Sequence, residues 1–293
     1  MGSASPELRW GVERRLEFIE FRLYWDGGIN RSDITGYFGV SVPQASKDLS
    51  QYQELAPGNI DYDKSEKRYV ATTAFKPKFL QADADQYLSQ LRAVTEREAA
   101  PDETWLGSIP TADWMPIPHR RVDPVVLRTL LAAIRDRQAV KVFYQSMSDK
   151  HPDPIWRIIS PHALGSDGFR WHVRAFCSID RIFKDFLLSR CLKCKPAGEA
   201  EAKPEDDVSW HELIELRLKP NPGLSKSQQQ VIASDFDMDN NELRLSVRKS
   251  LLYYFEKRLR LDVAEALDDP REAPVVIANK AEFEEALAET RAH

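Results

Sequence analysis

The fold of the central part of the chain is decided by the stretch Gly168-Phe169-Arg170-Trp171-His172-Val173-Arg174-Ala175-Phe176. Side chains alternate between the two faces of a β-strand. The members expected to face the core are Trp171, Val173 and Ala175. The members expected on the opposite face, as a row of positive donors, are Arg170, His172 and Arg174. Because a row of cations on a strand is unfavourable unless an anion meets it, we expect a ligand here first.

The bulk composition is that of a globular protein with two or three domains in 293 residues. Apolar residues make up 42% and charged residues 30%. No apolar run is long enough to span a membrane and no signal-peptide pattern is present, so we expect a cytoplasmic protein. The three cysteines include one C-x-x-C, Cys191 and Cys194, without a second ligand pair. Structural thiols are therefore favoured over zinc or redox chemistry, and no metal or cofactor is expected.

The net charge of −5 conceals an uneven distribution along the chain. Residues 120–198 contain 15 Lys and Arg against 7 Asp and no Glu, whereas residues 199–293 contain 13 Lys and Arg against 21 Asp and Glu. The positive excess thus lies around the opening stretch. The acidic C-terminal part is expected to make contacts other than with phosphate.

The N-terminal part predicts three helices with a tight turn between the last two. Apolar spacing indicates a helix over residues 6–25, a second over 31–38, and a third that begins at the N-cap Ser41. In the third helix, the residues expected to face inward are Ala45, Leu49 and Tyr52. Those expected to face outward are Gln44, Lys47 and Gln51. This pattern is typical of a helix-turn-helix, whose second helix enters the major groove of DNA.

Residues 59–70 predict two strands joined by a charged turn, which would form a wing beside the helix-turn-helix. The alternative is a small helical domain with a hairpin whose charges are merely solvated. The predicted DNA-binding residues are Ser41, Gln44, Ser46, Lys47, Gln51, Lys64, Lys67 and Arg68. A helix over 82–97 and a proline-bearing connector follow, and Trp105 and Trp114 in that connector are expected to pack on a neighbouring domain or subunit.

The central part predicts one helix followed by short strands. The helix is expected over 124–136, and the strands are expected over 140–146, 155–162, 169–176 and 182–193. Short strands at regular spacing after one helix indicate a small, strongly bent barrel.

These segments resemble the WYL domain, an Sm-like barrel fused to a winged helix in bacterial transcription regulators. The resemblance is carried by Val140–Ser146, Trp156–His162, Asp167–Phe176 and Phe183–Arg190. The triplet Trp-Tyr-Leu, after which the domain is named, is Trp171-His172-Val173 in this chain, so only the tryptophan is identical. The flanks resemble the winged helix and C-terminal extension of repressors of bacterial phage-defence islands, through residues 41–53, 216–225 and 247–255.

The resemblance implies a basic groove that senses a nucleotide or oligonucleotide. Arg supplies planar donors for phosphate, and Tyr or His can stack on bases. The residues implied to bind the ligand are Tyr144, Ser146, Arg157, His162, His172, Arg174 and Arg190. Alternatively, Arg157 and Arg174 pair with Asp153 or Asp185, and His162 caps a turn.

The last part predicts strands over 212–218 and 242–247 and helices over 227–234 and 250–259. The second helix carries an apolar face of Leu251, Leu252, Phe255 and Leu259. An acidic surface with an aromatic helix favours subunit contact, with intramolecular packing as the alternative.

The sequence therefore predicts an α+β protein with four segments: a winged helix-turn-helix (1–75), a helix and connector (76–120), a WYL Sm-like barrel (121–200) and an α/β dimerisation domain (201–293). The predicted function is a homodimeric repressor of a phage-defence operon, released by an anionic nucleotide or oligonucleotide. The alternative is an Sm-like module that binds RNA or single-stranded nucleic acid without operator specificity. No hydrolase, nucleotide-binding or metalloprotease motif occurs, so no catalytic residue is predicted.

Overall fold

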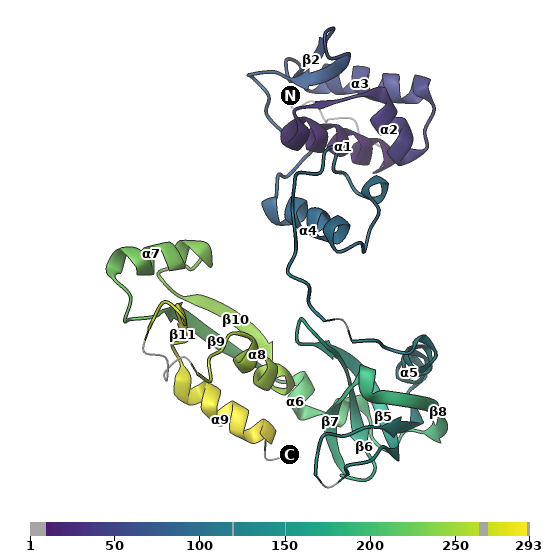
Figure 1. Cartoon of the computed structure of the whole chain (residues 1–293), viewed down its shortest axis with the longest axis vertical. Coiled ribbons are helices and arrows are strands. Elements are labelled where there is room, and N and C mark those ends of the chain that lie inside the picture. Colours follow the sequence, from purple (N-terminus) through teal and green to yellow (C-terminus); the bar gives the residue numbers. More distant parts are fainter. Residues whose placement is uncertain (1–9, 119, 150, 264–268, 292–293) are drawn as a thin grey trace, which may run out of the picture. The chain divides into compact units, whose positions relative to one another are not determined.

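The computed structural model describes residues 10–118, 120–149, 151–263 and 269–291. The chain forms two compact units, residues 1–116 and 117–293, and each is described by itself. Figure 1 labels their elements. Among the described residues, no helix combines the length and apolar character needed to cross a membrane.

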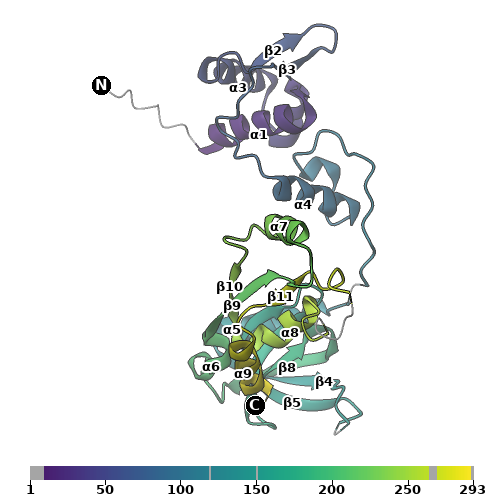
Figure 2. The same ribbon diagram turned by 90° about the vertical axis from the view of Figure 1, so that its left-hand side faces the viewer.

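The N-terminal unit (Figure 2) begins with three helices and a small sheet, and it also contains a fourth helix, α4 (Ala84–Thr95). The first three helices are α1 (Trp10–Asp26), α2 (Arg31–Phe38) and α3 (Val42–Leu55). Its strands are β1 (Gly28–Ile29), β2 (Ile60–Asp63) and β3 (Arg68–Ala71), in the order β1-β3-β2. The second helix and the hairpin confirm the prediction, whereas β1 was not predicted. The first four residues predicted for helix α1, 6–9, lie outside the described residues.

Local chemistry explains the turn between α2 and α3. Gly39 ends α2 with φ 64°, a left-handed conformation that glycine adopts without a steric penalty. Ser41 then caps α3, and its Oγ accepts a hydrogen bond from the backbone N–H of Gln44 at 3.4 Å. Behind the turn lies a core of fully buried side chains, which includes Leu16, Ile19, Ile34, Ala45, Leu49 and Tyr52.

The segment after the hairpin packs back on the winged helix through a buried carboxylate. Glu20 of α1 is fully buried and accepts hydrogen bonds from the backbone N–H groups of Lys78, Phe79 and Leu80. The hydroxyl of Tyr52 donates to the same carboxylate at 2.9 Å. Helix α4 (Ala84–Thr95) and a 3₁₀ turn η1 (Pro101–Glu103) follow.

The two connector tryptophans differ in burial. The Trp105 ring lies edge-on to Phe18 and Phe21 of α1, at centroid distances of 5.6 and 5.5 Å, which confirms the prediction that it packs on the neighbouring domain. The Trp114 ring is 40% exposed and carries the guanidinium of Arg92 at 5.4 Å. Only Trp105 therefore belongs to a core.

The central part of the second unit is a helix on a five-stranded antiparallel sheet. The elements are α5 (Pro124–Asp136), β4 (Gln138–Tyr144), β5 (Ile155–Ser166), β6 (Trp171–Cys177), β7 (Ile182–Leu187), the 3₁₀ turn η2 (Leu188–Arg190) and β8 (Cys191–Glu199). The strand order is β7-β6-β5-β4-β8. The strand predicted over 182–193 is thus two strands separated by η2. No ladder joins β7 to β8 within the described ranges, so a closed barrel is not confirmed.

The opening stretch differs from its predicted alternation. Val173 and Ala175 are fully buried in the core, as predicted, but Trp171 is 56% exposed because it lies at the end of β6, beyond that core. The prediction that Trp171 holds the barrel together was therefore wrong. His172 and Arg174 on the opposite face are 5% and 8% exposed. The predicted row of free cations is instead a second buried face, covered by later parts of the chain.

The C-terminal part of the second unit is a three-stranded sheet with helices. Its elements are the 3₁₀ turn η3 (Pro204–Asp206), α6 (Val208–His211), β9 (Leu213–Pro220), α7 (Lys226–Asp235), β10 (Leu243–Arg248), the 3₁₀ turn η4 (Lys249–Leu251), α8 (Leu252–Arg258), β11 (Val275–Ile277) and α9 (Lys280–Arg291). Its strand order is β10-β9-β11. The sequence did not predict β11 or α9, although α9 supplies Phe283, Ala286 and Leu287 to the core beside Leu216 and Leu252. Leu259, predicted on the apolar face, is 38% exposed.

Candidate nucleic-acid interface and ligand pocket

Helix α3 has one buried face and one polar face. The predicted inward residues Ala45, Leu49 and Tyr52 are fully buried. On the polar face, Ser41 and Lys47 are exposed, and Gln44, Ser46 and Gln51 are partly exposed. The structure thus brings together the five residues predicted on this helix. A polar helix face on a rigid apolar base is suited to reading the major groove.

A buried carboxylate that the sequence analysis missed lies under this face. Asp48 is fully buried and accepts two hydrogen bonds from Arg15 of α1, Nε at 2.7 Å and Nη2 at 3.1 Å. Its Oδ1 also accepts from Nε2 of Gln44 at 2.9 Å. The spacing of four between Gln44 and Asp48 was the available sign of this pair.

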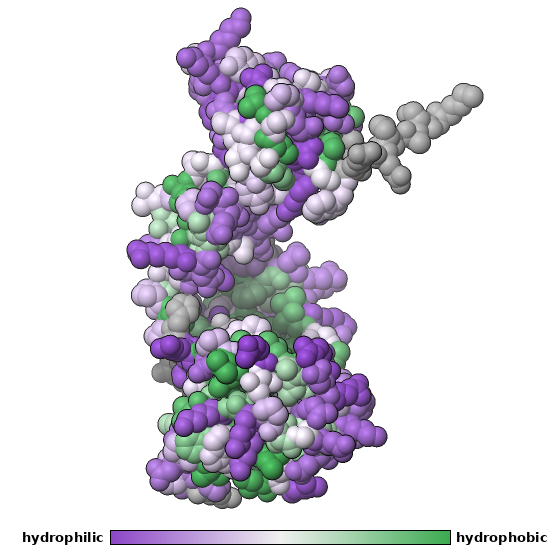
Figure 3. All heavy atoms as spheres, turned by 90° about the vertical axis from the view of Figure 1, so that its right-hand side faces the viewer, coloured by the Kyte–Doolittle hydropathy of each residue, from purple (hydrophilic) through white to green (hydrophobic). Residues whose placement is uncertain are grey.

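The hairpin between β2 and β3 carries the other predicted DNA-binding residues. Lys64 and Lys67 are exposed in its turn, which Asp63 stabilises by accepting from the N–H groups of Ser65 and Glu66. Arg68, at the start of β3, pairs with Glu66. Figure 3 shows predominantly hydrophilic side chains at the end of the unit where this hairpin lies. Two exposed ammonium groups are therefore available to phosphate.

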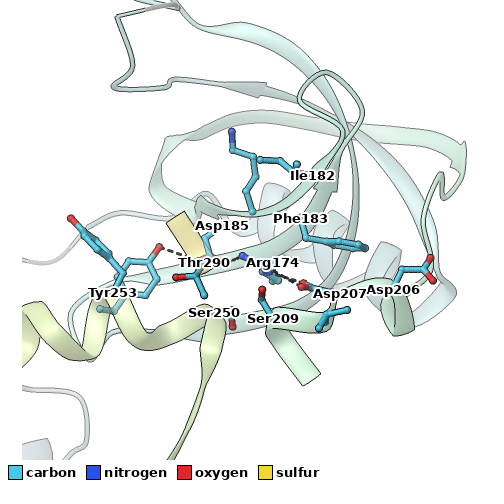
Figure 4. A pocket seen from close by; sticks show the side chains of 13 residues that line it. Arg174, Ile182, Phe183, Asp185, Asp206, Asp207, Ser209, Ser250, Tyr253 and Thr290 are labelled. Atoms are coloured by element: carbon cyan, nitrogen blue, oxygen red, sulfur yellow. Dashed lines mark hydrogen bonds and ion pairs between the residues drawn. The ribbon is translucent and has the colours of Figure 1, made fainter. Parts of the chain in front are cut away.

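A second candidate site is a cavity of about 540 Å³ within the second unit (Figure 4). Strands β6 and β7 form one wall, and the segments around α6 and α8 form the other. The polar residues that line it are Arg174, Lys184, Asp185, Asp206, Asp207, Ser209, Ser250, Tyr253, Tyr254 and Thr290. The cavity therefore lies between the sheet and the C-terminal part of the chain.

Arg174 is the centre of a buried polar network in this cavity. Its Nε and Nη2 donate to the two carboxylate oxygens of Asp207 at 2.7 and 3.0 Å. Its Nη1 contacts Asp185 at 3.5 Å, and the hydroxyl of Tyr254 donates to the other oxygen of Asp185 at 3.1 Å. Nε2 of His162 lies 2.9 Å from Asp207. The guanidinium is thus already paired with carboxylates.

Protonation in the network follows from burial and charge. Burial alone would raise the pKa of Asp207, but the hydrogen bonds from His162 and Arg174, with the charge of Arg174, lower it to about 2. Burial raises the pKa of Asp185 and lowers the pKa of His172 from 6.5. His172 is therefore neutral at pH 7 and does not add to a row of cations.

One polar atom of the cavity wall has no hydrogen-bond partner among the described residues. It is the hydroxyl of Ser250, a residue that lines the cavity and is only 8% exposed. Buried polar atoms in proteins almost always have partners. Ser250 is therefore available to a polar group of a ligand.

The residues predicted to bind the ligand divide into two groups. His162, His172 and Arg174 lie in or beside the network, with the His172 ring 4.6 Å from that of Tyr254. Of the seven, Arg174 alone lines the cavity itself, and the four that belong neither to the network nor to the cavity wall are Tyr144, Ser146, Arg157 and Arg190. Buried Arg157 pairs with Asp180 at 3.0 Å rather than with Asp153, and the hydroxyl of Tyr144 accepts from the N–H of Leu187.

The alternative that Arg174 pairs with Asp185 is confirmed at 3.5 Å, but the other polar residues around Arg174 were missed because they come from other segments. Asp207 caps α6, where it also accepts from the backbone N–H of Trp210, and Tyr254 and Ser250 come from α8 and the turn before it. All three lie outside residues 121–200. No local pattern near residue 174 indicates them.

The cysteines are buried or partly buried, and all three are free. Burial raises the pKa of Cys191 to about 12 and that of Cys194 to about 11. Both thiols are therefore protonated at neutral pH, which is unfavourable for redox chemistry or metal binding. Among the residues that the structure describes, no three or more His, Cys, Asp or Glu side chains come together in a group that could hold a metal ion.

The fold and these sites define a WYL-domain protein with an N-terminal winged helix. Residues 11–93 match the BrxR transcriptional regulator winged helix-turn-helix domain, residues 125–196 the WYL domain, and residues 213–283 the BrxR transcriptional regulator C-terminal dimerization domain. The chain belongs to the family of the DNA-binding transcriptional repressor CapW. The predicted resemblance is thus confirmed.

Relatives from several bacteria carry that name. The chain is 40% identical to CapW of Stenotrophomonas maltophilia over 292 residues, which covers 99% of the chain and 96% of the relative. Identity is 39% to CapW of Pseudomonas aeruginosa, over 95% and 93% of the two chains. It is 41% to CapW of Escherichia coli (strain KTE188), over 94% and 91%. Among solved structures, proteasome accessory factor B/C of Arthrobacter aurescens matches with a TM-score of 0.26 at 13% identity, over 99% of this chain and about half (52%) of that one.

Proposed function

We propose that the protein is a cytoplasmic, non-enzymatic, homodimeric repressor of a phage-defence operon. The winged helices of two copies would bind the half-sites of an inverted repeat, with α3 in the major groove. The observation that carries this proposal is the polar face of α3 on its buried base, in a chain similar along nearly its whole length to repressors. The C-terminal domain would hold the two copies together.

An anionic nucleotide or oligonucleotide in the Arg174 cavity would release the repressor. Because Arg174 is paired with Asp207 and Asp185, an incoming phosphate has to compete with a carboxylate. Asp207 lies in the segment that leads into the C-terminal domain, so its displacement would change how that domain meets the sheet. Release requires the ligand to bind the altered state more tightly than the DNA-bound state.

A gel shift on a duplex from the gene's own upstream region tests DNA binding. We expect a specific complex whose affinity falls steeply as salt rises. Gln44→Ala and Lys47→Ala should each weaken it, by roughly tenfold for a lost bidentate base contact. The absence of a specific complex with the wild-type protein would contradict the proposal.

The unpartnered hydroxyl of Ser250 offers a mild test of the cavity. Ser250→Ala removes a group without a partner, so it should leave folding and operator binding unchanged. We expect it to raise, by several-fold, the concentration of a nucleotide or short oligodeoxynucleotide that dissociates the operator complex. Thr129→Ala, on α5, serves as the control. Unchanged release in the Ser250 variant by every nucleotide that acts on the wild type would exclude a contact with Ser250.

A second candidate function, binding of RNA or single-stranded nucleic acid, is favoured by the outer face of the sheet. There Phe143 lies opposite Trp156 with ring centroids 5.3 Å apart. The lysines on the same face, with no ion pair among the described residues, are Lys141, Lys193 and Lys195. Aromatic rings flanked by lysines suit stacked bases and phosphates.

Trp156→Ala separates the two functions. If the outer face is the main nucleic-acid site, this variant loses binding to a fluorescent single-stranded oligonucleotide and Gln44→Ala does not. If the winged helix is the main site, Gln44→Ala loses binding to the upstream duplex and Trp156→Ala retains it.

A further inference from the structure

A chain of partly buried hydrogen bonds leads from helix α1 to the polar face of α3. Arg15 donates from Nη1 to the carbonyl oxygen of Gly11 at 2.8 Å, and from Nε and Nη2 to Asp48. Asp48 in turn accepts from Nε2 of Gln44. The side chain of Asp48 is fully buried and that of Arg15 is 13% exposed. The amide of Gln44 is thus linked to the core of the unit.

This link determines which way the Gln44 amide faces. Both carboxylate oxygens of Asp48 accept hydrogen bonds from Arg15, and a carboxylate has no proton to donate, so the Nε2 side of the amide must face it. A flipped amide would place Oε1 of Gln44 against a carboxylate oxygen, which is repulsive. One N–H of Nε2 is used by Asp48, and the second N–H and Oε1 remain. Those two groups are the donor and acceptor that a glutamine offers to N7 and N6 of adenine.

We propose that Asp48 and Arg15 are positioning residues that hold the Gln44 amide ready to read an adenine. Neither residue needs to touch DNA in this role. The proposal rests on the proposed function and deepens it, because it assigns the base that the repressor discriminates and the residues that set the discrimination. Holding the amide before binding reduces the rotational freedom that Gln44 loses when it meets the base.

The alternative is that Asp48 and Arg15 form a purely structural ion pair between two helices. That role and the positioning role both predict that Asp48→Ala weakens DNA binding. They differ in which duplexes are affected. A structural defect weakens binding to every duplex alike, whereas loss of positioning removes discrimination at one base and leaves non-specific affinity in place.

Operator duplexes with single 7-deazaadenine substitutions distinguish these roles, because the analogue lacks the N7 acceptor and keeps N6. The wild-type chain should lose roughly tenfold in affinity at one position of each half-site. Asp48→Ala should bind the natural and substituted duplexes within about twofold of each other, as should Gln44→Ala. Lys47→Ala is the matched control on the same helix and should keep the wild-type ratio.

Arg15→Lys is a second variant that tests the proposal if Asp48→Ala does not fold. Lysine retains the positive charge, but it offers Asp48 one donor group where arginine offers two. Its affinity ratio should fall between those of the wild type and Gln44→Ala. A wild-type ratio in a folded Asp48→Ala or Arg15→Lys variant overturns the positioning role. A wild type that binds the upstream duplex without sensitivity to any 7-deazaadenine also overturns it. If the wild type forms no specific complex, the proposed function fails first, and the positioning role fails with it.

Discussion

At the scale of single residues, Arg174 shows what a local pattern contains and what it lacks. Its place on a basic strand predicts a site residue, and the structure places it in the wall of a cavity. Its bidentate partner, Asp207, is in another segment, so the sequence around residue 174 predicts a free cation where the structure has a buried ion pair. The site was predictable from the residue type, but its electrostatics depended on long-range packing.

The burial of this pair changes the expected effect of Arg174→Ala. Removing the guanidinium leaves Asp207 buried with His162 as its one polar side-chain partner among the described residues, and breaking such a pair costs about 3–5 kcal/mol of unfolding free energy. Urea unfolding of the full chain measures this. Arg181→Ala, which removes an arginine that is 67% exposed and paired with Glu201, should cost no more than about 1 kcal/mol. Equal effects of the two substitutions would contradict the buried pair.

The lowered pKa of Asp207 makes a specific contribution to acid sensitivity. Its folded-state pKa of about 2 lies below the ordinary 3.8, so the carboxylate stabilises the fold fully above about pH 4, and this stabilisation is lost as the pH falls towards 2. The contribution is about 2 kcal/mol for a shift of this size. Urea unfolding between pH 5 and pH 2.5 should show that Asp207→Asn lacks this part of the pH dependence. Identical slopes in the two proteins would exclude it.

At the scale of elements, the bounds of a helix were predicted correctly where residues next to its ends determine them. Helix α2 and helix α5 begin and end where their caps and apolar spacing predict, because Gly39, Asp123 and Pro124 act on their own neighbours. The prediction failed for β6, where alternation predicts one solvated face. Residues of that face are buried because α8 and the segment before α6 cover it, and neither is indicated by the strand itself.

One buried carboxylate of helix α1, that of Glu20, binds three backbone N–H groups of the segment after the wing. Glu20→Ala would leave the N–H groups of Lys78, Phe79 and Leu80 without their acceptor, so we expect a loss of about 2–4 kcal/mol. Hydrogen exchange of a peptide spanning residues 76–82 should accelerate by at least tenfold, in line with that loss. Glu17→Ala, on the same helix, should leave this exchange unchanged. Unchanged protection in Glu20→Ala would show that other contacts hold the segment.

At the scale of the whole molecule, the distribution of charge matters more than its sum. The net charge of −5 would disfavour contact with DNA, but the two exposed lysines of the wing lie at the tip of a hairpin, away from the acidic C-terminal part in sequence. The domain order was predictable because each domain carries its own motifs. The predicted dimer agrees with the match of residues 213–283 to a dimerization domain, but no motif in the sequence indicates which surface of that domain makes the contact.

The salt dependence of operator binding affinity shows how many wing hairpins contact the DNA in the complex. Each lysine that contacts a phosphate contributes about 0.9 to the slope of log affinity against log salt. The double variant Lys64→Gln with Lys67→Gln should therefore reduce the slope by about 3.6 if a dimer places two wings on the duplex, and by about 1.8 if a single copy binds. The double variant Lys219→Gln with Lys226→Gln, in the C-terminal domain, should leave the slope unchanged. Gel shifts or fluorescence anisotropy between 50 and 200 mM salt, about the range over which such slopes are resolved, give the measurement. An unchanged slope in the wing variant would show that these lysines remain solvated in the complex, and would remove the wing from the proposed interface.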